Sequence, residues 1–344
     1  MVGARGKEGF PFHRVVLVAD ELPEEAPLSQ TYLRRDLEKT QSHVLSELKQ
    51  AIASLGLEIA HYQNPAQLAA NASQHFADIV LSIYGGQESR NRMALIPAIC
   101  ESLGLQYLGA DAYGRIASQD KETSKRLAME VGLLTPDYLV IREPDDLIAL
   151  KSFPTPFVVK PLWEGSSIGI GPNNLIKSAT DGLLLAEDLL EALQQPLIVE
   201  AFVPGREVNY SLIQLSDRTE ARLTEAFLPG SPNHFDSHLY DAEEKLDRNS
   251  RLQNRPLALD LLSEVDRDGL ARLPKIFGGL GYARIDGKLF NNRFQFIEVT
   301  PDAWLASSGS FVSGFLSSGW SYEDVISAVL LSRRERRPRR QANG

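Results

Sequence analysis

Two acids and an arginine lie close together in the segment 283–300 (ARIDGKLFNNRFQFIEVT). Two apolar runs around a polar centre predict a pair of adjacent strands. Because side chains alternate along a strand, Arg284 and Asp286 should share a face, with Glu298 beside Asp286 on the neighbouring strand. Carboxylates held this close either repel one another or bind a hard divalent cation such as Mg²⁺. Taken alone, the segment leaves a metal site and a pair of solvated acids both open.

A second segment with residues suited to ligand binding is 156–170 (PFVVKPLWEGSSIGI), in which an apolar strand ends at Lys160. A lysine at the end of a strand places a fixed positive charge, and the Gly and Ser residues that follow allow backbone amides to approach a phosphate. The pattern GxxxxGK[ST] is absent, so the loop is not of the Walker A type. By itself, the loop could equally be a simple turn.

The third segment is 197–207 (LIVEAFVPGRE), a buried strand that ends at Glu200 and is followed by a Pro-Gly turn and Glu207. Backbone groups beside apolar side chains suit the edge of an adenine ring, and a carboxylate farther on suits ribose hydroxyls. The competing interpretation is a surface hairpin with scattered acids.

The elements that must position these segments divide the chain into three parts. Strands near 14–18, 77–83 and 105–108 alternate with helices over 36–55 and up to Gly104, which predicts a parallel α/β unit. Later strands are expected at 157–160, 197–199, 207–215, 282–286 and 294–299, with helices at 118–131, 181–194 and 258–280. We therefore expect an N-terminal α/β domain (1–117), a small central α+β domain (118–205), a C-terminal α+β domain (206–332) and a basic, disordered tail (333–344).

Composition limits the classes of function. The chain has 344 residues, is 43% hydrophobic and carries a formal net charge of −9, which argues against binding nucleic acid. No apolar run reaches the ~20 residues of a membrane span, and the N-terminus lacks the apolar stretch of a signal peptide. The single cysteine, Cys100, lies in an apolar pattern and is expected in the core. These features predict a cytoplasmic enzyme that binds neither nucleic acid nor membranes.

Five segments in register resemble the ATP-grasp superfamily, and most closely the D-alanine–D-alanine ligase family, over roughly residues 78–330. They are LGADAYGRIASQDKETSKRLAMEVGLLTPDY (108–138), VVKPLWEGSSIGI, IVEAFVPGRE, YDAEEKL (240–246) and ARID followed by IEV. The resemblance implies an ATP-grasp fold of mixed α/β and α+β class. It also implies an ATP-dependent carboxylate–amine ligase that forms an amide or peptide bond through an acyl phosphate and releases ADP and phosphate.

The resemblance also implies roles for individual residues. Lys121 and Lys160 would contact the phosphates of ATP, and the loop of Glu164, Gly165, Ser166 and Ser167 would close over them. Glu200, Phe202 and Val203 would line the adenine site. Glu207 would bind the ribose. In catalysis, Ser166 would help to place the substrate, and Lys245 would contact the transferred phosphoryl group. Arg284 would stabilise negative charge on the acyl phosphate and the tetrahedral intermediate. Asp286 and Glu298 would bind Mg²⁺ (or Mn²⁺).

Several positions depart from the family pattern on the amino-acid side of the site. Thr300 replaces the Asn of the metal motif and offers a weaker ligand, and Trp304 stands where the family has a small residue near the oxyanion region. The family's early acidic segment, which receives the first amino acid's amine, has only Glu38 as a candidate. We therefore expect a ligase with other small-molecule carboxylate and amine substrates, as in specialised metabolism. A true D-alanine–D-alanine ligase and a non-catalytic nucleotide-binding protein remain alternatives, and a homodimer is one assembly to consider.

Overall fold

A four-stranded parallel sheet organises the first part of the molecule in the computed structural model, which describes residues 9–22, 35–86, 90–240 and 252–332. Its order is β4-β1-β5-β6. The strands are β1 (Arg14–Val18), β4 (Glu58–Tyr62), β5 (Ile79–Ser82) and β6 (Gln106–Tyr107), and the helices around them are α1 (Ser42–Ser54), α2 (Pro65–Asn71) and α3 (Leu95–Leu103). The predicted parallel α/β unit is confirmed.

Two details of this part differ from the expectation. The helix expected from residue 36 begins at Ser42, because residues 35–38 form a 3-10 turn, η1 (Arg35–Glu38), and β3 (Thr40–Gln41) pairs with β2 (Glu21–Leu22). Strand β4 was not predicted, since it lies at the edge of the sheet and its side chains are exposed or half-buried. Cys100 is buried in the core, as predicted, and burial raises the pKa of its thiol to about 12.

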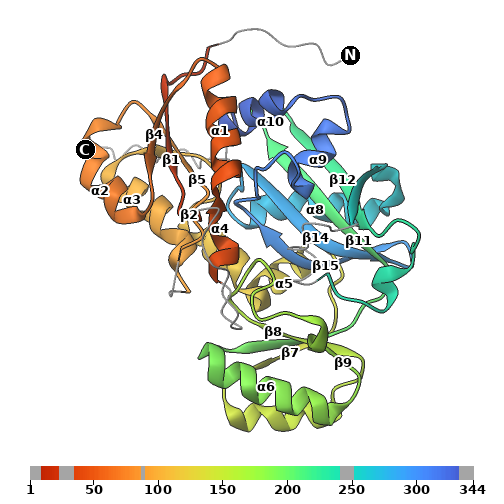
Figure 1. The fold of residues 1–344 in the computed structure, drawn as a ribbon. Helices are drawn as coiled ribbons and strands as arrows, with labels where there is room; N and C mark the ends of the chain where they lie inside the picture. Colours follow the sequence, from red (N-terminus) through yellow and green to blue (C-terminus); the bar gives the residue numbers. More distant parts are fainter. Residues whose placement is uncertain (1–8, 23–34, 87–89, 241–251, 333–344) are drawn as a thin grey trace, which may run out of the picture.

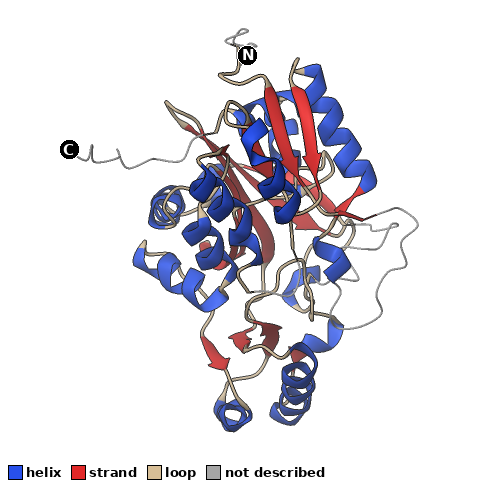
Figure 2. Cartoon of the chain, turned by 90° about the vertical axis from the view of Figure 1, so that its left-hand side faces the viewer, coloured by secondary structure: helices blue, strands red, loops and turns tan. Residues whose placement is uncertain are grey.

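A second, antiparallel sheet forms the central domain, with the order β7-β10-β8-β9. Its elements are β7 (Tyr138–Ile141), β8 (Phe157–Pro161), β9 (Leu175–Ile176) and β10 (Leu197–Ala201), covered by α6 (Ala179–Leu193) and η4 (Pro144–Ser152). Helix α6 packs very closely on β8: a Cβ atom added to Gly182 would lie 2.5 Å from the ring of Phe157. Figures 1 and 2 show this domain as a separate lobe below the rest of the molecule.

The third sheet is antiparallel, with the order β13-β12-β11-β14-β15. Its strands are β11 (Arg206–Gln214), β12 (Thr219–Phe227), β13 (Gln253–Leu257), β14 (Tyr282–Phe290) and β15 (Arg293–Thr300). The helices of this part are α4 (Ala112–Gln119), α5 (Lys121–Glu130), α8 (Glu264–Ile276), α9 (Ser310–Leu316) and α10 (Tyr322–Leu330). Short 3-10 turns occur at η2 (Ala72–Gln74), η3 (Arg92–Ala94), η5 (Pro172–Asn174), η6 (His234–Asp236) and η7 (Leu259–Leu261).

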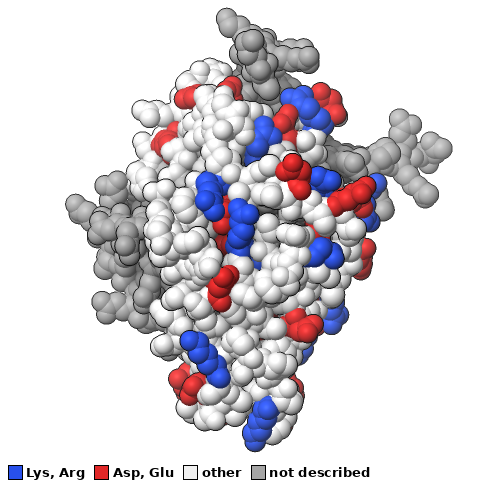
Figure 3. Space-filling view, turned by 90° about the vertical axis from the view of Figure 1, so that its right-hand side faces the viewer, with Lys and Arg blue, Asp and Glu red and all other residues white. Residues whose placement is uncertain are grey.

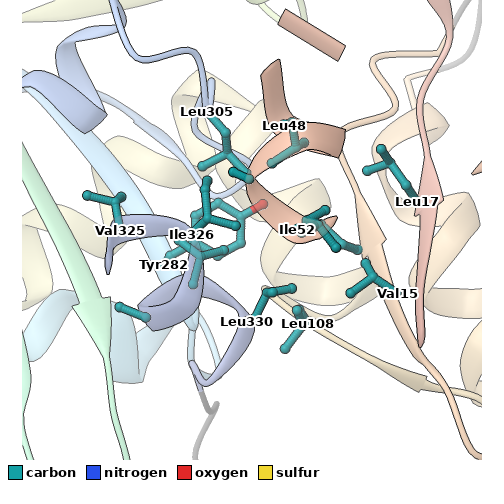
Figure 4. Packing of buried hydrophobic residues seen from close by; sticks show 14 of the residues in the cluster. Val15, Leu17, Leu48, Ile52, Leu108, Tyr282, Leu305, Val325, Ile326 and Leu330 are labelled. Atoms are coloured by element: carbon teal, nitrogen blue, oxygen red, sulfur yellow. The ribbon is translucent and has the colours of Figure 1, made fainter. Parts of the chain in front are cut away.

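The hydrophobic cores follow the sheets but not the linear order of the chain. Helices α4 and α5 contribute Ala117 and Ala128 to the core under the C-terminal sheet, so the start of the predicted central domain packs with the C-terminal part. Helix α10 packs into the same core as β1 and α1, with Leu48 and Ile326 among its members (Figure 4). The domain boundaries at 117 and 205 stay a proposal.

The structure also bears on the predicted membrane spans, on the distribution of surface charge and on the basic tail. Among the described helices, none is long and apolar enough to cross a membrane. On the face drawn in Figure 3, basic and acidic side chains are interspersed. The basic tail at 333–344 lies outside the described residues.

Candidate active site

The paired strands β14 and β15 place an arginine and two acids as the alternation of side chains predicts. The register sets Asp286 opposite Glu298 and Arg284 opposite Thr300. Arg284 donates to both oxygens of Asp286, from Nε at 2.6 Å and from Nη2 at 2.6 Å. Asn209 on β11 donates to the same carboxylate, over 2.8 Å. Burial alone would lower the pKa of Arg284, but the Asp286 carboxylate raises it, so the guanidinium stays charged and fixed in direction.

The oxygen donors at this edge fit a magnesium ion that is bound together with phosphate. Within the described residues there is no cluster of three or more His, Cys, Asp or Glu side chains that could hold a metal. Asp286 and Glu298 supply two carboxylates, and Thr300 a hydroxyl. Mg²⁺ commonly uses one or two carboxylates and completes its shell with water and substrate phosphates. The donor set therefore suits Mg²⁺ with phosphate, and the metal roles of Asp286, Glu298 and Thr300 stay predictions.

Three lysines gather around one buried acid where the central sheet meets α5. Glu200 accepts from Lys160 over 2.6 Å and lies 3.0 Å from Lys125 Nζ. Burial alone would raise the pKa of Glu200, but the two lysines lower it to about 2. Lys121 donates to the backbone carbonyl of Glu164. Several basic side chains are thus held close together around Glu200, an arrangement that suits an anionic ligand such as a polyphosphate.

Glu298 of the C-terminal sheet lies within electrostatic range of Lys160 on the central sheet and of Lys121 on α5. Burial lowers the pKa of Lys121, and the charge of Glu298 opposes that effect. Burial would also lower the pKa of Lys160, but Glu200 and then Glu298 raise it. The side chains that the sequence assigned to phosphate and to metal are therefore close enough to interact electrostatically.

The loop after β8 has an unusual backbone at two serines. Ser166 and Ser167 have φ angles of 50° and 59°, a left-handed conformation that non-glycine residues adopt at a cost of roughly 1 kcal/mol or more each. Ser166 is exposed and Ser167 is buried. Asn174 braces the loop by donating to the carbonyl oxygens of Val159 and Gly169. The loop is thus held in a defined shape in which Ser166 faces solvent.

Glu38, the candidate receptor for a substrate amine, lies directly against this loop. Its Oε1 accepts from the backbone N–H of Gly165 over 3.1 Å. Its Oε2 accepts from Nη2 of Arg92 over 2.8 Å, and the same nitrogen donates to Glu164 over 2.9 Å. Burial raises the pKa of Glu38. The structure therefore brings together residues 127 positions apart, and adds Arg92, which the sequence analysis did not select.

The predicted nucleotide side is organised by a second residue that the sequence analysis missed. Lys288 on β14 forms an ion pair with Glu207 over 2.9 Å, and its ammonium lies 5.7 Å from the centre of the Phe202 ring. It also donates to the carbonyl oxygens of Gly205 and Phe235. Strands β10 and β11 belong to different sheets, so the surface-hairpin alternative for residues 197–207 is wrong.

Three predicted residues are not tied to this group by a described contact. Lys245 lies outside the described residues. Val203 is half-buried beside Phe202. Trp304 is 41% exposed, so it is not a core side chain, and it lies near Gly309. The adjacent Asp302 is 3.6 Å from the buried Arg115. The place of Trp304 in an amino-acid pocket stays a prediction.

Arg92, Lys125 and Lys288 share the reason for which they were missed. Each is a single basic residue in an otherwise ordinary helix or strand pattern, and its role is visible only from its partners. A weak signal existed for Lys125, which lies four residues after Lys121 and therefore on the same side of a helix. No local signal distinguished Arg92.

Comparison with known proteins adds an independent line of argument. A family model described as "D-ala D-ala ligase C-terminus" matches residues 127–331. The D-alanine–D-alanine ligase of Cupriavidus taiwanensis is 28% identical over 287 residues, which cover 81% of this chain and 83% of that protein. The corresponding enzyme of Mycolicibacterium gilvum is 30% identical over 254 residues, 67% of this chain and 66% of the relative.

Solved structures support the same fold. The D-alanine–D-alanine ligase of Bacillus anthracis complexed with ATP superimposes with a TM-score of 0.68 at 16% identity, covering 93% of this chain and 97% of that one. The VanG D-Ala:D-Ser ligase of Enterococcus faecalis gives a TM-score of 0.67 at 15% identity, with coverage of 93% and 98%. At such identities the likeness concerns the fold alone.

Proposed function

The chain belongs to the D-alanine–D-alanine ligase family, whose C-terminal model covers more than half of it, and from this premise we propose that it joins two molecules of D-alanine. It is an ATP-dependent ligase that forms C–N bonds. The curated relatives named above are D-alanine–D-alanine ligases, which favours this substrate over the other substrates expected from the sequence. D-Serine is the first alternative amine to test, because one structural relative is a D-Ala:D-Ser ligase.

The observation that carries the proposal is that Lys121 and Lys160 lie within electrostatic range of Glu298, which pairs with Asp286 across β14 and β15. The lysines would bind ATP phosphates. Asp286 and Glu298 would hold Mg²⁺ together with phosphate oxygens, where the ion would neutralise phosphate charge. Such a site promotes transfer by positioning and by charge stabilisation, without a protein nucleophile.

We assign distinct tasks to the remaining residues of the candidate site. Arg284, aimed by Asp286, would stabilise negative charge on an acyl phosphate and on the tetrahedral intermediate that the attacking amine forms. Glu38 would receive the ammonium of the first amino acid. The loop from Glu164 to Ser167 would cover the phosphates and keep water from the acyl phosphate.

The test is ADP and phosphate release in the presence of Mg²⁺ and D-alanine, with the dipeptide identified by mass spectrometry. Arg284→Gln should abolish turnover, whereas Arg218→Gln, which changes the same charge on the surface, should not. Release of AMP and pyrophosphate would falsify the acyl-phosphate route. ADP release that needs other amino acids, and not D-alanine, would reject the substrate and keep the reaction class.

A second candidate, a ligase for other substrates, is favoured by two observations on the amino-acid side of the site. Glu38 already accepts from the guanidinium of Arg92, and exposed Trp304 replaces a small residue on the amino-acid side. A panel of single and paired amino acids, followed through ADP, separates the two candidates. Replacing Trp304 with Gly should then change the preferred amino acid while ATP affinity stays the same.

A further inference from the structure

Arg92 joins the N-terminal part of the molecule to the loop after β8. It begins the turn η3 in the N-terminal part, and its side chain is 5% exposed. Its Nη2 donates to Glu38 on η1 over 2.8 Å and to Glu164 in the phosphate loop over 2.9 Å. Its Nε donates to Glu38 over 3.1 Å. The Arg92 guanidinium therefore binds one carboxylate of the N-terminal part, Glu38, and one of the loop after β8, Glu164.

Further hydrogen bonds fix Glu164 in the loop and connect the loop to Glu38 a second time. Glu164 is fixed at its other oxygen by Gln195 over 2.8 Å, and its carbonyl accepts from Lys121. Glu38 accepts from the amide of Gly165, the next residue of the same loop. A change in the loop therefore reaches Glu38 by two paths, through the Arg92 guanidinium and through the Gly165 amide.

Charge and geometry both explain why an arginine stands here. Glu38 and Glu164 are like charges in a buried setting, and each would disfavour ionisation of the other. A guanidinium can bind two carboxylates at once in a fixed fork, whereas an ammonium acts as a point charge. Asp302 adds a further negative charge near Glu38, and Arg92 offsets it.

We propose that Arg92 is a positioning residue that transmits the closure of the phosphate loop to Glu38, so that binding of nucleotide fixes the group that receives the amino acid. The inference rests on the proposed function to the extent that residues 164–167 bind phosphate. It predicts that nucleotide alone orders the segment Arg35–Glu38, although no nucleotide contact is expected from that segment.

The experiment is amide hydrogen exchange of the full chain with and without the ATP analogue AMP-PCP and Mg²⁺. In the unmodified protein, the analogue should slow exchange both in the loop 163–169 and at residues 35–38. In Arg92→Gln, the loop should still respond, while the response at 35–38 should fall by about fivefold or more, the size of a modest coupling. Arg142→Gln, which removes a surface arginine that pairs with Glu122, is the matched control and should behave as the unmodified protein.

Each outcome decides the inference. An unchanged response at 35–38 in Arg92→Gln would overturn it, because the Gly165 amide would then suffice. An unmodified protein that binds the analogue without slowing exchange at 35–38 would overturn it as well, and would leave the ligase proposal intact. Failure of the unmodified protein to bind AMP-PCP would overturn both. If Arg92→Gln does not fold, Arg92→Lys replaces it, since a lysine keeps the charge but not the two-carboxylate fork.

Discussion

At Glu200, two lysines of the candidate site share one buried carboxylate. Its two oxygens lie 2.6 Å from Lys160 and 3.0 Å from Lys125. The sequence assigned Glu200 to the adenine site from the family resemblance. In the structure its side chain is occupied by the lysines, so a direct role toward adenine stays a prediction and its electrostatic role is the clearer one.

Replacing Glu200 with Gln tests that role through pH. Leaving buried lysines unpaired should cost about 3–5 kcal/mol in the free energy of unfolding at pH 7. The folded pKa of about 2 lies below the ordinary value of 4.5, so the stabilisation is full above pH 4.5 and is lost as pH falls toward 2. The stability difference between the two proteins, measured by urea unfolding, should shrink across that window. A difference that does not change with pH would contradict the assignment.

Mutation can rank the residues that we propose as metal ligands. Asp286→Asn should reduce kcat at least about 100-fold, because it removes both a carboxylate for Mg²⁺ and the charge that aims Arg284. Thr300→Ala should reduce kcat by less than about tenfold, since one hydroxyl is a weak ligand. Steady-state kinetics at several Mg²⁺ concentrations gives both values. Equal losses would show that Thr300 is a full ligand.

Lys288 provides a test of the nucleotide side. Lys288→Met keeps the length of the side chain but loses the ion pair with Glu207 and two bonds to backbone carbonyls. We expect KM for ATP to rise about tenfold, equivalent to about 1.4 kcal/mol, with kcat within a factor of about two. The exposed Lys151, changed to Met, is the control. A change in kcat with KM unaffected would place Lys288 at the chemical step instead.

At the scale of elements, the sequence predicted those strands whose own residues are continuously apolar. β1 and the start of β8 are of this kind, whereas the β14–β15 pair was predicted from two shorter apolar runs and from alternating side chains, which also gave the Arg284–Asp286 face. The edge strands β4 and β13 were missed, and so was the interior strand β12, whose sequence TEARLTEAF is not a continuous apolar run. The helix expected at 118–131 is in fact two helices, since Asp120 ends α4 and caps α5. Local patterns do not encode such contacts.

The N-cap residue Asp120 should affect KM for ATP as well as the stability of helix α5. Its Oδ1 accepts from the amide of Thr123 over 2.9 Å, and its Oδ2 accepts from Trp163 Nε1 over 3.1 Å. Asp120→Ala should cost about 1 kcal/mol in stability and also raise KM for ATP, because Lys121 begins the capped helix. Asp111→Ala, which removes the cap of α4, should cost about as much stability and leave KM unchanged. Thermal unfolding and kinetics separate the two effects, and equal KM values would contradict the link.

At the scale of the whole molecule, the two ends of the described chain are packed into one core. Leu48 and Ile52 of α1, Ile326 of α10 and Tyr282 of β14 are fully buried in the same cluster, as Figure 4 shows. The central sheet has its own core around Leu189. The N-terminal sheet and the C-terminal helices should therefore unfold as one unit, and the central domain as another.

Two substitutions that each create a cavity, one in each core, test this division into unfolding units. Leu48→Ala and Leu189→Ala each remove the same buried atoms, and each should cost about 2–5 kcal/mol. If the first core is continuous, Leu48→Ala should speed amide exchange in β1 and also in α10, more than 270 positions away. Leu189→Ala should speed exchange in β7, β8 and β10 while α10 stays protected. Because an amide buried in a cooperative unit exchanges only when that unit opens, the affected amides define the unit. Faster exchange confined to the first 110 residues in Leu48→Ala would mean that α10 is held independently, and the ligase would then consist of three separately stable parts.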